Sequence, residues 1–146
     1  MKKIFKFLIF LLPWFLSSLF MRNVNFYKSL NLPFFAPPPI LFAIVWPILY
    51  LLIAISIYKI SKIGFSKEYK YFLIANYIFN QSFTFLFFYF KSIILGTLSS
   101  ILSLITAIFL FLETKKSDKK TSYLLIPYLI WLIFASILSI SILFLN

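Results

Sequence analysis

The sequence predicts an all-α, polytopic membrane protein built as a bundle of five transmembrane helices. Apolar residues make up 63% of its 146 residues, and the mean hydropathy is +1.04, above the range of soluble globular domains. The charged residues, 12% of the chain, fall between long apolar runs. Each run is about twenty residues long, which is the length that one helix needs to cross a bilayer.

A chain of this length forms one domain. The apolar runs predict membrane spans at about residues 4–21, 39–60, 71–90, 93–112 and 121–145. The connection between the first two, residues 22–38, is polar and aromatic and is long for a link between helices. Because long connections in compact domains are often functional, we expect this loop to cover a binding site.

The first run could be a secretory signal peptide, since lysines precede its apolar core. However, no small residues suited to a cleavage site follow Ser17 and Ser18, where Leu19, Phe20 and Met21 stand instead. We therefore expect a retained transmembrane helix.

Three consecutive prolines, 37–39, predict the start of the second helix, because a missing backbone N–H costs nothing in the first helical turn. Pro47 lies inside the same helix and predicts a local kink, although its role is not explained by the sequence. Phe42, Trp46 and Tyr50 follow at intervals of four residues. This spacing places the three rings on one helix face.

The third span is unusually polar near its middle. Asn76 and Asn80 share a face, which Phe83 and Phe87 continue. A carboxamide in hydrocarbon needs hydrogen-bond partners. Two interpretations stay open: a hydrogen bond that only joins helices, or a polar anchor in a ligand pocket.

The last two spans add complementary surfaces. The fourth carries small residues that allow close helix packing, namely Gly96, Ser100, Ser103 and Ala107. In the fifth, Trp131 shares a face with Tyr128, with Ala135 and with Leu138 or Ser139. Trp46 and Trp131 both lie deeper in their helices than tryptophans that anchor at the membrane surface. Deep tryptophans facing amides and phenylalanines are typical of an apolar pocket with a few polar anchors.

Composition excludes several functions. The chain has no Cys and no His, which excludes disulfides, zinc sites and catalysis by those residues, and two glycines cannot form a phosphate-binding loop. The net charge of +11 does not indicate that the protein binds nucleic acid, since the apolar runs leave no room for a soluble basic face. Most basic residues fall in the N-terminal segment and in the second and fourth connections, which predicts the N-terminus inside and the C-terminus outside.

Several motifs carry a resemblance to a known family. Pro37 and Pro38 are followed, after seven residues, by Trp46 and then by Leu49 and Tyr50. Together with three further segments, around Phe26–Tyr27, around Asn80 with Phe87–Phe88, and Pro127-Tyr128-x2-Trp131-x2-Phe134-Ala135, this order resembles the tryptophan-rich sensory protein/translocator protein (TspO) family. The resemblance extends over nearly the whole chain.

The resemblance implies a five-helix bundle, often a homodimer, with a pocket beneath the first loop that binds porphyrins and related tetrapyrroles. We expect twelve residues, from this resemblance and from the shared helix faces, to form the site: Pro37, Pro38, Phe42, Trp46, Tyr50, Asn80, Phe83, Phe87, Trp131, Phe134, Ala135 and Ser139. Phenylalanines replace family tryptophans in the first loop and third span, which removes indole donors. The cholesterol-recognition segment of animal members is absent.

The sequence therefore predicts a membrane-embedded small-molecule binding protein or sensor, in the cytoplasmic membrane of a prokaryote. A facilitator of tetrapyrrole transport, a light-dependent porphyrin-degrading enzyme and a structural subunit remain alternatives. Apart from Lys6 and Lys59 near the span ends, only tyrosines are ionisable within the spans, which disfavours acid–base catalysis and leaves photochemistry through Trp46, Trp131 and Tyr50. No cofactor is required, a porphyrin or haem-like ligand would bind without a His ligand to iron, and the partners expected are this ligand, the bilayer and a second copy of the chain.

Overall fold

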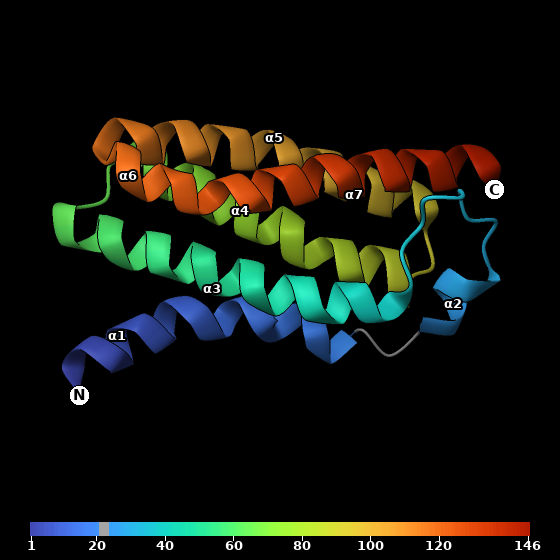
Figure 1. Cartoon of the computed structure of the whole chain (residues 1–146), viewed down its shortest axis with the longest axis horizontal. Coiled ribbons are helices and arrows are strands. Elements are labelled where there is room, and N and C mark those ends of the chain that lie inside the picture. The colour runs from blue at the N-terminus through green and yellow to red at the C-terminus, as the bar shows by residue number, and fades with distance from the viewer. Residues whose placement is uncertain (21–23) are drawn as a thin grey trace.

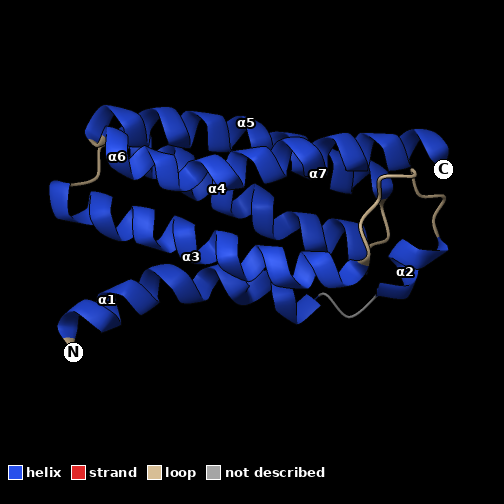
Figure 2. Ribbon diagram, viewed as in Figure 1, coloured by secondary structure: helices blue, strands red, loops and turns tan. Residues whose placement is uncertain are grey.

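The computed structural model describes residues 1–20 and 24–146 (Figure 1). Within these ranges all regular structure is helical and no strand occurs (Figure 2). The all-α prediction is thereby confirmed. The long helices run alongside one another, with the N-terminus at one end of the molecule and the C-terminus at the other (Figure 1).

In chain order the elements are α1 (Lys2–Leu11), the 3-10 helix η1 (Leu12–Phe20), α2 (Val24–Ser29), α3 (Pro39–Ile63), α4 (Lys67–Thr84), the π-helical turn η2 (Phe85–Tyr89), α5 (Ile93–Ser117), α6 (Lys119–Ser122), the 3-10 turn η3 (Tyr123–Leu125) and α7 (Ile126–Leu145). Among the described residues, three helical stretches are long and apolar enough to cross a membrane: Pro39–Ile63, Ile93–Ser117 and Lys119–Leu145. These stretches mark a membrane protein.

Local chemistry explains where the helices begin and end. Pro38 is the N-cap of α3, and Pro39 occupies the first helical position, as the proline run predicts. Gly64 follows α3 with φ of 115°, a conformation that side chains disfavour. Ser66 and Ser92 cap α4 and α5, because each side chain accepts a hydrogen bond from a backbone N–H of the first turn.

Several boundaries differ from the prediction. Helix α3 continues to Ile63 and α5 to Ser117, so lysines expected in connections lie in the last helical turns. Lysine is a good helix former, and its charge is favourable near a helix C-terminus. The loop 22–38 is also not wholly irregular, since Val24–Ser29 forms α2. We refer to its described residues, 24–38, as the covering segment.

The sequence predicts that the first apolar run forms one regular helix. The structure differs, because the 3-10 helix η1 replaces the second half of this run. Pro13 removes a backbone donor at this point. The irregular backbone is compensated from α4: Tyr77 Oη donates to the Pro13 carbonyl at 2.9 Å, and Gln81 Nε2 donates to the Trp14 carbonyl at 3.1 Å. The Ser17 N–H in turn donates to Gln81 Oε1 at 2.8 Å. Non-α backbone in a membrane requires such partners.

Helix α5 packs between α4 and α7, whereas α1 packs along α3 (Figure 1). The interior contains two apolar clusters. The larger lies toward the N-terminal end of the molecule and includes Trp14, Tyr50 and Ile53. The smaller joins Tyr27 of the covering segment to Phe87 and to α7. The cavity described next is lined by residues of both clusters.

Candidate functional site

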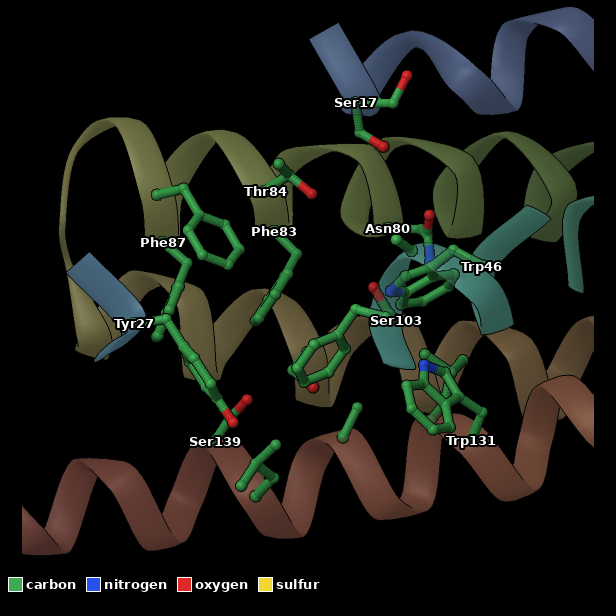
Figure 3. Close-up of a pocket in the computed structure, with 18 of the residues that line it drawn as sticks. Ser17, Tyr27, Trp46, Asn80, Phe83, Thr84, Phe87, Ser103, Trp131 and Ser139 are labelled. Atoms are coloured by element: carbon green, nitrogen blue, oxygen red, sulfur yellow. The ribbon is translucent and has the colours of Figure 1, made fainter. Parts of the chain in front are cut away.

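A cavity of about 220 Å³ lies inside the bundle, with lining residues from η1, the covering segment and helices α3, α4, α5 and α7 (Figure 3). Figure 3 shows Tyr27 and Phe87 toward one end, and Trp46 and Trp131 toward the other. Since Tyr27 belongs to the covering segment, its end of the cavity lies beneath that segment. The tryptophans lie at the opposite end.

Helix α3 contributes a wall of stacked and edge-on rings. Trp46 stacks on Tyr50, with ring centroids 5.4 Å apart. Trp131 of α7 meets Trp46 edge-on at 6.3 Å and Phe42 at 5.8 Å. Because Phe42, Trp46 and Tyr50 follow one another at a helical turn each, the wall continues along the cavity. Such rings provide a flat apolar surface against which a planar ligand can stack.

Helix α4 forms a second wall, and its end is modified by the π-helical turn η2. Phe83 stacks on Phe87 at 5.4 Å, and both line the cavity. The π-helical turn adds a residue to the helical repeat, which re-aims the following side chains. As a result the consecutive residues Phe87 and Phe88 are both buried and both reach the cavity.

Small side chains on the facing helices leave the cavity its volume. These are Ala43 of α3, Ser100 and Ser103 of α5, and Ala135 and Ser139 of α7. The small-residue stripe predicted on the fourth span thus has a second role, because two of its members face the cavity as well as allowing close packing.

The intramembrane amides belong to one hydrogen-bonded network. Asn76 Nδ2 donates to the Ser103 carbonyl at 2.9 Å, and Tyr128 Oη donates to Asn76 Oδ1 at 2.9 Å. Asn80 Nδ2 donates to Tyr128 Oη at 3.2 Å, and Gln81 Nε2 donates to Asn80 Oδ1 at 3.2 Å. The network links α5, α4 and α7, and Gln81 extends it to η1.

Two interpretations of the amides were open, and the two residues differ in what they contact. Asn76 is fully buried and is not among the cavity residues, so it joins helices. Asn80 takes part in the same network and also lines the cavity.

The cavity is electrically neutral. None of its lining residues carries a formal charge. Across the described residues, no group of three or more His, Cys, Asp or Glu side chains could hold a metal ion. Beneath the covering segment, Tyr27 Oη donates to the Pro37 carbonyl at 3.0 Å, and burial raises the pKa of the Tyr27 phenol. That group therefore remains a neutral donor.

The sequence model of the TspO/MBR family matches residues 5–145. The chain belongs to the TspO/MBR family. It is 36% identical over 125 residues to the tryptophan-rich protein TspO of Bacillus cereus, covering 84% of this chain and 82% of that protein. It is 35% identical over 127 residues to the uncharacterized membrane protein YtaB of Bacillus subtilis (85% and 82%) and over 124 residues to TspO of Archaeoglobus fulgidus (84% and 80%). The resemblance read from the motifs is confirmed.

In this TspO/MBR family member, nine of the twelve predicted site residues line the cavity: Phe42, Trp46, Tyr50, Asn80, Phe83, Phe87, Trp131, Ala135 and Ser139. The other three do not. Pro37 accepts the hydrogen bond from Tyr27, and Pro38 caps α3. The Phe134 ring packs on Trp131, with ring centroids 5.3 Å apart, and also on Phe35 of the covering segment, with centroids 6.3 Å apart.

Sequence reasoning did not assign the remaining lining residues to the site: Phe15, Ser17, Ser18, Tyr27, Ala43, Pro47, Thr84, Phe88, Ser100, Ser103, Leu132, Leu138 and Ile142. Several of them had a signal in the sequence, since Ser100 and Ser103 belong to the predicted small-residue stripe and Phe88 to a resembling motif. Pro47, which the sequence left unexplained, follows Trp46 directly and lines the cavity. Tyr27 belongs to a resembling motif, but only the fold brings it over the cavity.

Proposed function

We propose that this protein binds small molecules within the membrane, and that its ligands are porphyrins or related tetrapyrroles. The observation that carries the proposal is the aromatic wall of Phe42, Trp46 and Tyr50, which Trp131 joins edge-on, along a cavity without formally charged lining residues. Planar macrocycles gain most from such a surface, since they stack on aromatic rings over a large area. Membership of the TspO/MBR family supports the same class of ligand.

The proposal includes five spans in one domain, with the N-terminus inside. In addition to the three apolar helices, two further stretches form spans in this proposal. They are α1 continued by η1, and α4 continued by η2. Tyr77 and Gln81 satisfy the irregular backbone of η1 from α4, as a lipid environment requires. The basic ends of α3 and α5 lie at the end of the molecule that also holds the N-terminus (Figure 1). That end faces the cytoplasm in this proposal.

A tetrapyrrole requires the cavity to widen. Its volume of about 220 Å³ is below the roughly 300–1,000 Å³ of pockets that hold drug-sized ligands. Tyr27 enters the cavity from the covering segment, where its ring meets Phe42 at 5.7 Å. Withdrawal of the covering segment would remove this ring and provide both room and a path of entry.

Titration of protoporphyrin IX into the purified protein tests the proposal. We expect protoporphyrin IX to quench the tryptophan fluorescence, and the quenching to saturate at one ligand per protein chain. Replacing both cavity tryptophans, Trp46→Phe with Trp131→Phe, should weaken binding by about tenfold or more, as loss of stacking on two indoles implies. Trp14→Phe is the matched control, because Trp14 is buried but is not among the cavity residues. Unchanged affinity in the double variant would contradict the assignment of the cavity.

The ring contacts support a second candidate, light-dependent degradation of the bound porphyrin. Trp131, Trp46 and Tyr50 lie in sequence along the wall, with centroids 5.4–6.3 Å apart. All three are oxidisable side chains that line the cavity. Illumination of the complex in the presence of oxygen should then bleach the pigment faster than illumination with the Trp46→Phe, Trp131→Phe protein. Transport through the same cavity would instead appear as tetrapyrrole flux into liposomes.

A further inference from the structure

A second cavity, of about 170 Å³, lies on the side of the bundle and is lined by residues of α1, η1, α3 and α4. Its floor is buried, since Trp14 of η1 and Ile57 of α3 are only 2% and 4% exposed. Its rim is open, since Ile9 of α1 and Ile74 of α4 are 52% and 58% exposed. We refer to this feature as the lateral groove. It shares no lining residue with the cavity inside the bundle.

The lateral groove lies where α1 and α4 are not packed against each other. The two segments meet at Tyr77, whose Oη donates to the Pro13 carbonyl at 2.9 Å and whose ring meets Trp14 edge-on at 5.2 Å. Nearer the N-terminus, α1 packs along α3, whereas α4 packs against η1 and has no comparable contact with α1. The lining residues are apolar or aromatic, and none is charged. In a bilayer, lipid chains are as apolar as these side chains and fill such a space.

Each wall of the lateral groove continues into a lysine. Lys6 precedes Phe10 by four residues on α1, and Lys70 precedes Ile74 by four residues on α4. Residues at this spacing are neighbours on one helix face. Both lysines are exposed, and both helices begin at the end of the molecule that holds the N-terminus (Figure 1). The groove therefore has two cations at that end and hydrocarbon along the rest of its length.

The two lysines are available to a partner. Among the described residues, neither Lys6 nor Lys70 forms an ion pair, whereas Lys116 lies 2.6 Å from Glu113. The acid nearest to Lys70 in the sequence is Glu68, and residues two positions apart on a helix do not face each other. The charge beside the groove is therefore positive and uncompensated.

This charge decides between the two occupants that a groove within a bilayer can have, a lipid or a second copy of the chain. A second copy in the same orientation would bring its own basic N-terminal segment to the same end, so that like charges would oppose each other. An anionic phospholipid instead complements both parts of the groove. In the proposed topology this end lies at the cytoplasmic surface, where anionic headgroups attract lysines.

We propose that the lateral groove binds a phospholipid with an anionic headgroup. One acyl chain lies along the groove over Trp14 and Ile57, and the phosphate is held by Lys6 and Lys70. Because long lysine side chains extend toward the membrane surface, both ammonium groups can reach the depth of a headgroup. The inference is separate from the ligand of the bundle cavity.

Trp14 provides a fluorescent reporter of the groove. The chain has three tryptophans, so Trp46→Phe with Trp131→Phe leaves Trp14 as the single fluorophore. This protein, as the full chain in detergent, is titrated with phosphatidylglycerol or phosphatidylcholine whose acyl chains carry bromine, which quenches tryptophan at short range. We expect phosphatidylglycerol to quench at about tenfold lower concentration than phosphatidylcholine at low salt. Lys6→Gln with Lys70→Gln should reduce this preference to about twofold or less.

Lys115→Gln with Lys119→Gln is the matched control. It removes the same charge from exposed lysines near the C-terminal end of α5 and at the start of α6, and neither residue lines the groove. The preference for phosphatidylglycerol should survive in the control. An equal loss in both double variants would assign the effect to general surface charge and overturn the proposal. Absence of quenching, or an equal response to both lipids, would overturn it as well.

Two further measurements identify the occupant. Soluble glycerol 3-phosphate should not relieve the quenching, because the acyl chain contributes to binding, and displacement by it would contradict the groove. Native mass spectrometry of the chain with all three tryptophans should show phosphatidylglycerol retained in preference to phosphatidylcholine, with the preference lost in the Lys6→Gln, Lys70→Gln protein. A lipid-free dimer in that measurement would show that a second copy covers the groove.

The outcomes are independent of the proposed function. If protoporphyrin IX does not bind but the lipid preference depends on Lys6 and Lys70, the tetrapyrrole assignment fails and the lipid site stands. If protoporphyrin IX saturates the protein but the preference is the same in every variant, the lipid site fails and the proposed function stands.

Discussion

Asn31 and Asn146 hold each other through reciprocal hydrogen bonds. The Asn31 N–H donates to Asn146 Oδ1, and Asn146 Nδ2 donates to the Asn31 carbonyl, each at 3.0 Å. Asn31 Nδ2 adds a bond to the Leu145 carbonyl at 3.2 Å. The covering segment is therefore tied to the end of α7, at the end of the molecule that holds the C-terminus (Figure 1).

Asn146→Ala should increase the rates at which protoporphyrin IX enters and leaves the cavity. The substitution removes both reciprocal bonds, and a hydrogen bond on an exposed surface contributes about 1 kcal/mol. Stopped-flow fluorescence should show exchange about fivefold to tenfold faster, with a smaller change in affinity. Asn25→Ala, an exposed asparagine of the same segment, serves as control. Equal rates for the protein and Asn146→Ala would show that this tie does not limit access.

Tyr128→Phe should destabilise the bundle without opening a cavity. The hydroxyl donates to Asn76 and accepts from Asn80, so its removal leaves a fully buried amide oxygen without its donor. In membranes such bonds contribute about 0.5–2 kcal/mol. Thermal unfolding in detergent should show a lower midpoint for Tyr128→Phe than for Tyr123→Phe, whose ring is exposed. A loss of equal size in both variants would contradict the role of the network.

Gly96→Ala should disturb the cavity from the outside. A Cβ atom at Gly96 would lie 2.8 Å from Phe87 Cδ2 and 2.9 Å from its Cβ, closer than packed carbon atoms approach. Phe87 must then move, and with it the stack on Phe83 that lines the cavity. We expect a stability loss of about 1–3 kcal/mol and weaker protoporphyrin IX binding. Leu95→Ala, on an exposed face of the same helix, should change neither.

Asp118→Ala should lower thermal stability at neutral pH by removing the cap of α6. The Thr121 hydroxyl, and then the Lys120 and Thr121 backbone N–H groups and Lys59, hold the pKa of Asp118 below its ordinary value of 3.8. The folded protein therefore favours the ionised form. Its contribution to stability is present above pH 3.8 and is lost as the pH falls through the lower folded pKa.

The measurement is the difference in melting temperature between the protein and Asp118→Ala as a function of pH. This difference should narrow as the pH is lowered below 3.8. The difference between Asp118→Asn and Asp118→Ala should stay constant over the same range, since neither side chain ionises. If the difference in melting temperature between the protein and Asp118→Ala did not depend on pH, the charge of Asp118 would contribute nothing to stability.

Periodicity and composition predicted the helices well, because hydrocarbon imposes strong rules on apolar length and polar position. The ring stripe on α3 and the face of Trp131 were readable for the same reason, since a helix repeats every 3.6 residues. Both sets of residues line the cavity. These parts of the site depend on local sequence alone.

Other parts depended on long-range contacts. The change from α1 to η1 requires Gln81 and Tyr77, which are 64 or more residues distant in sequence. The shared inward direction of Phe87 and Phe88 results from a π-helical turn that no residue pattern announces. Tyr27 reaches the cavity only because the covering segment folds back over it. No local signal predicts such placements.

The dependence of η1 on α4 has a consequence for how the protein is made. A chain emerges from the ribosome from its N-terminus, so Leu12–Phe20 is available for insertion well before Gln81 has been synthesised. Until then, the Trp14 carbonyl and the Ser17 N–H lack the side chain that satisfies them in the finished bundle. Hydrocarbon penalises this state. We therefore expect the first segment to adopt a different conformation, or wait at the membrane surface, until α4 arrives beside it.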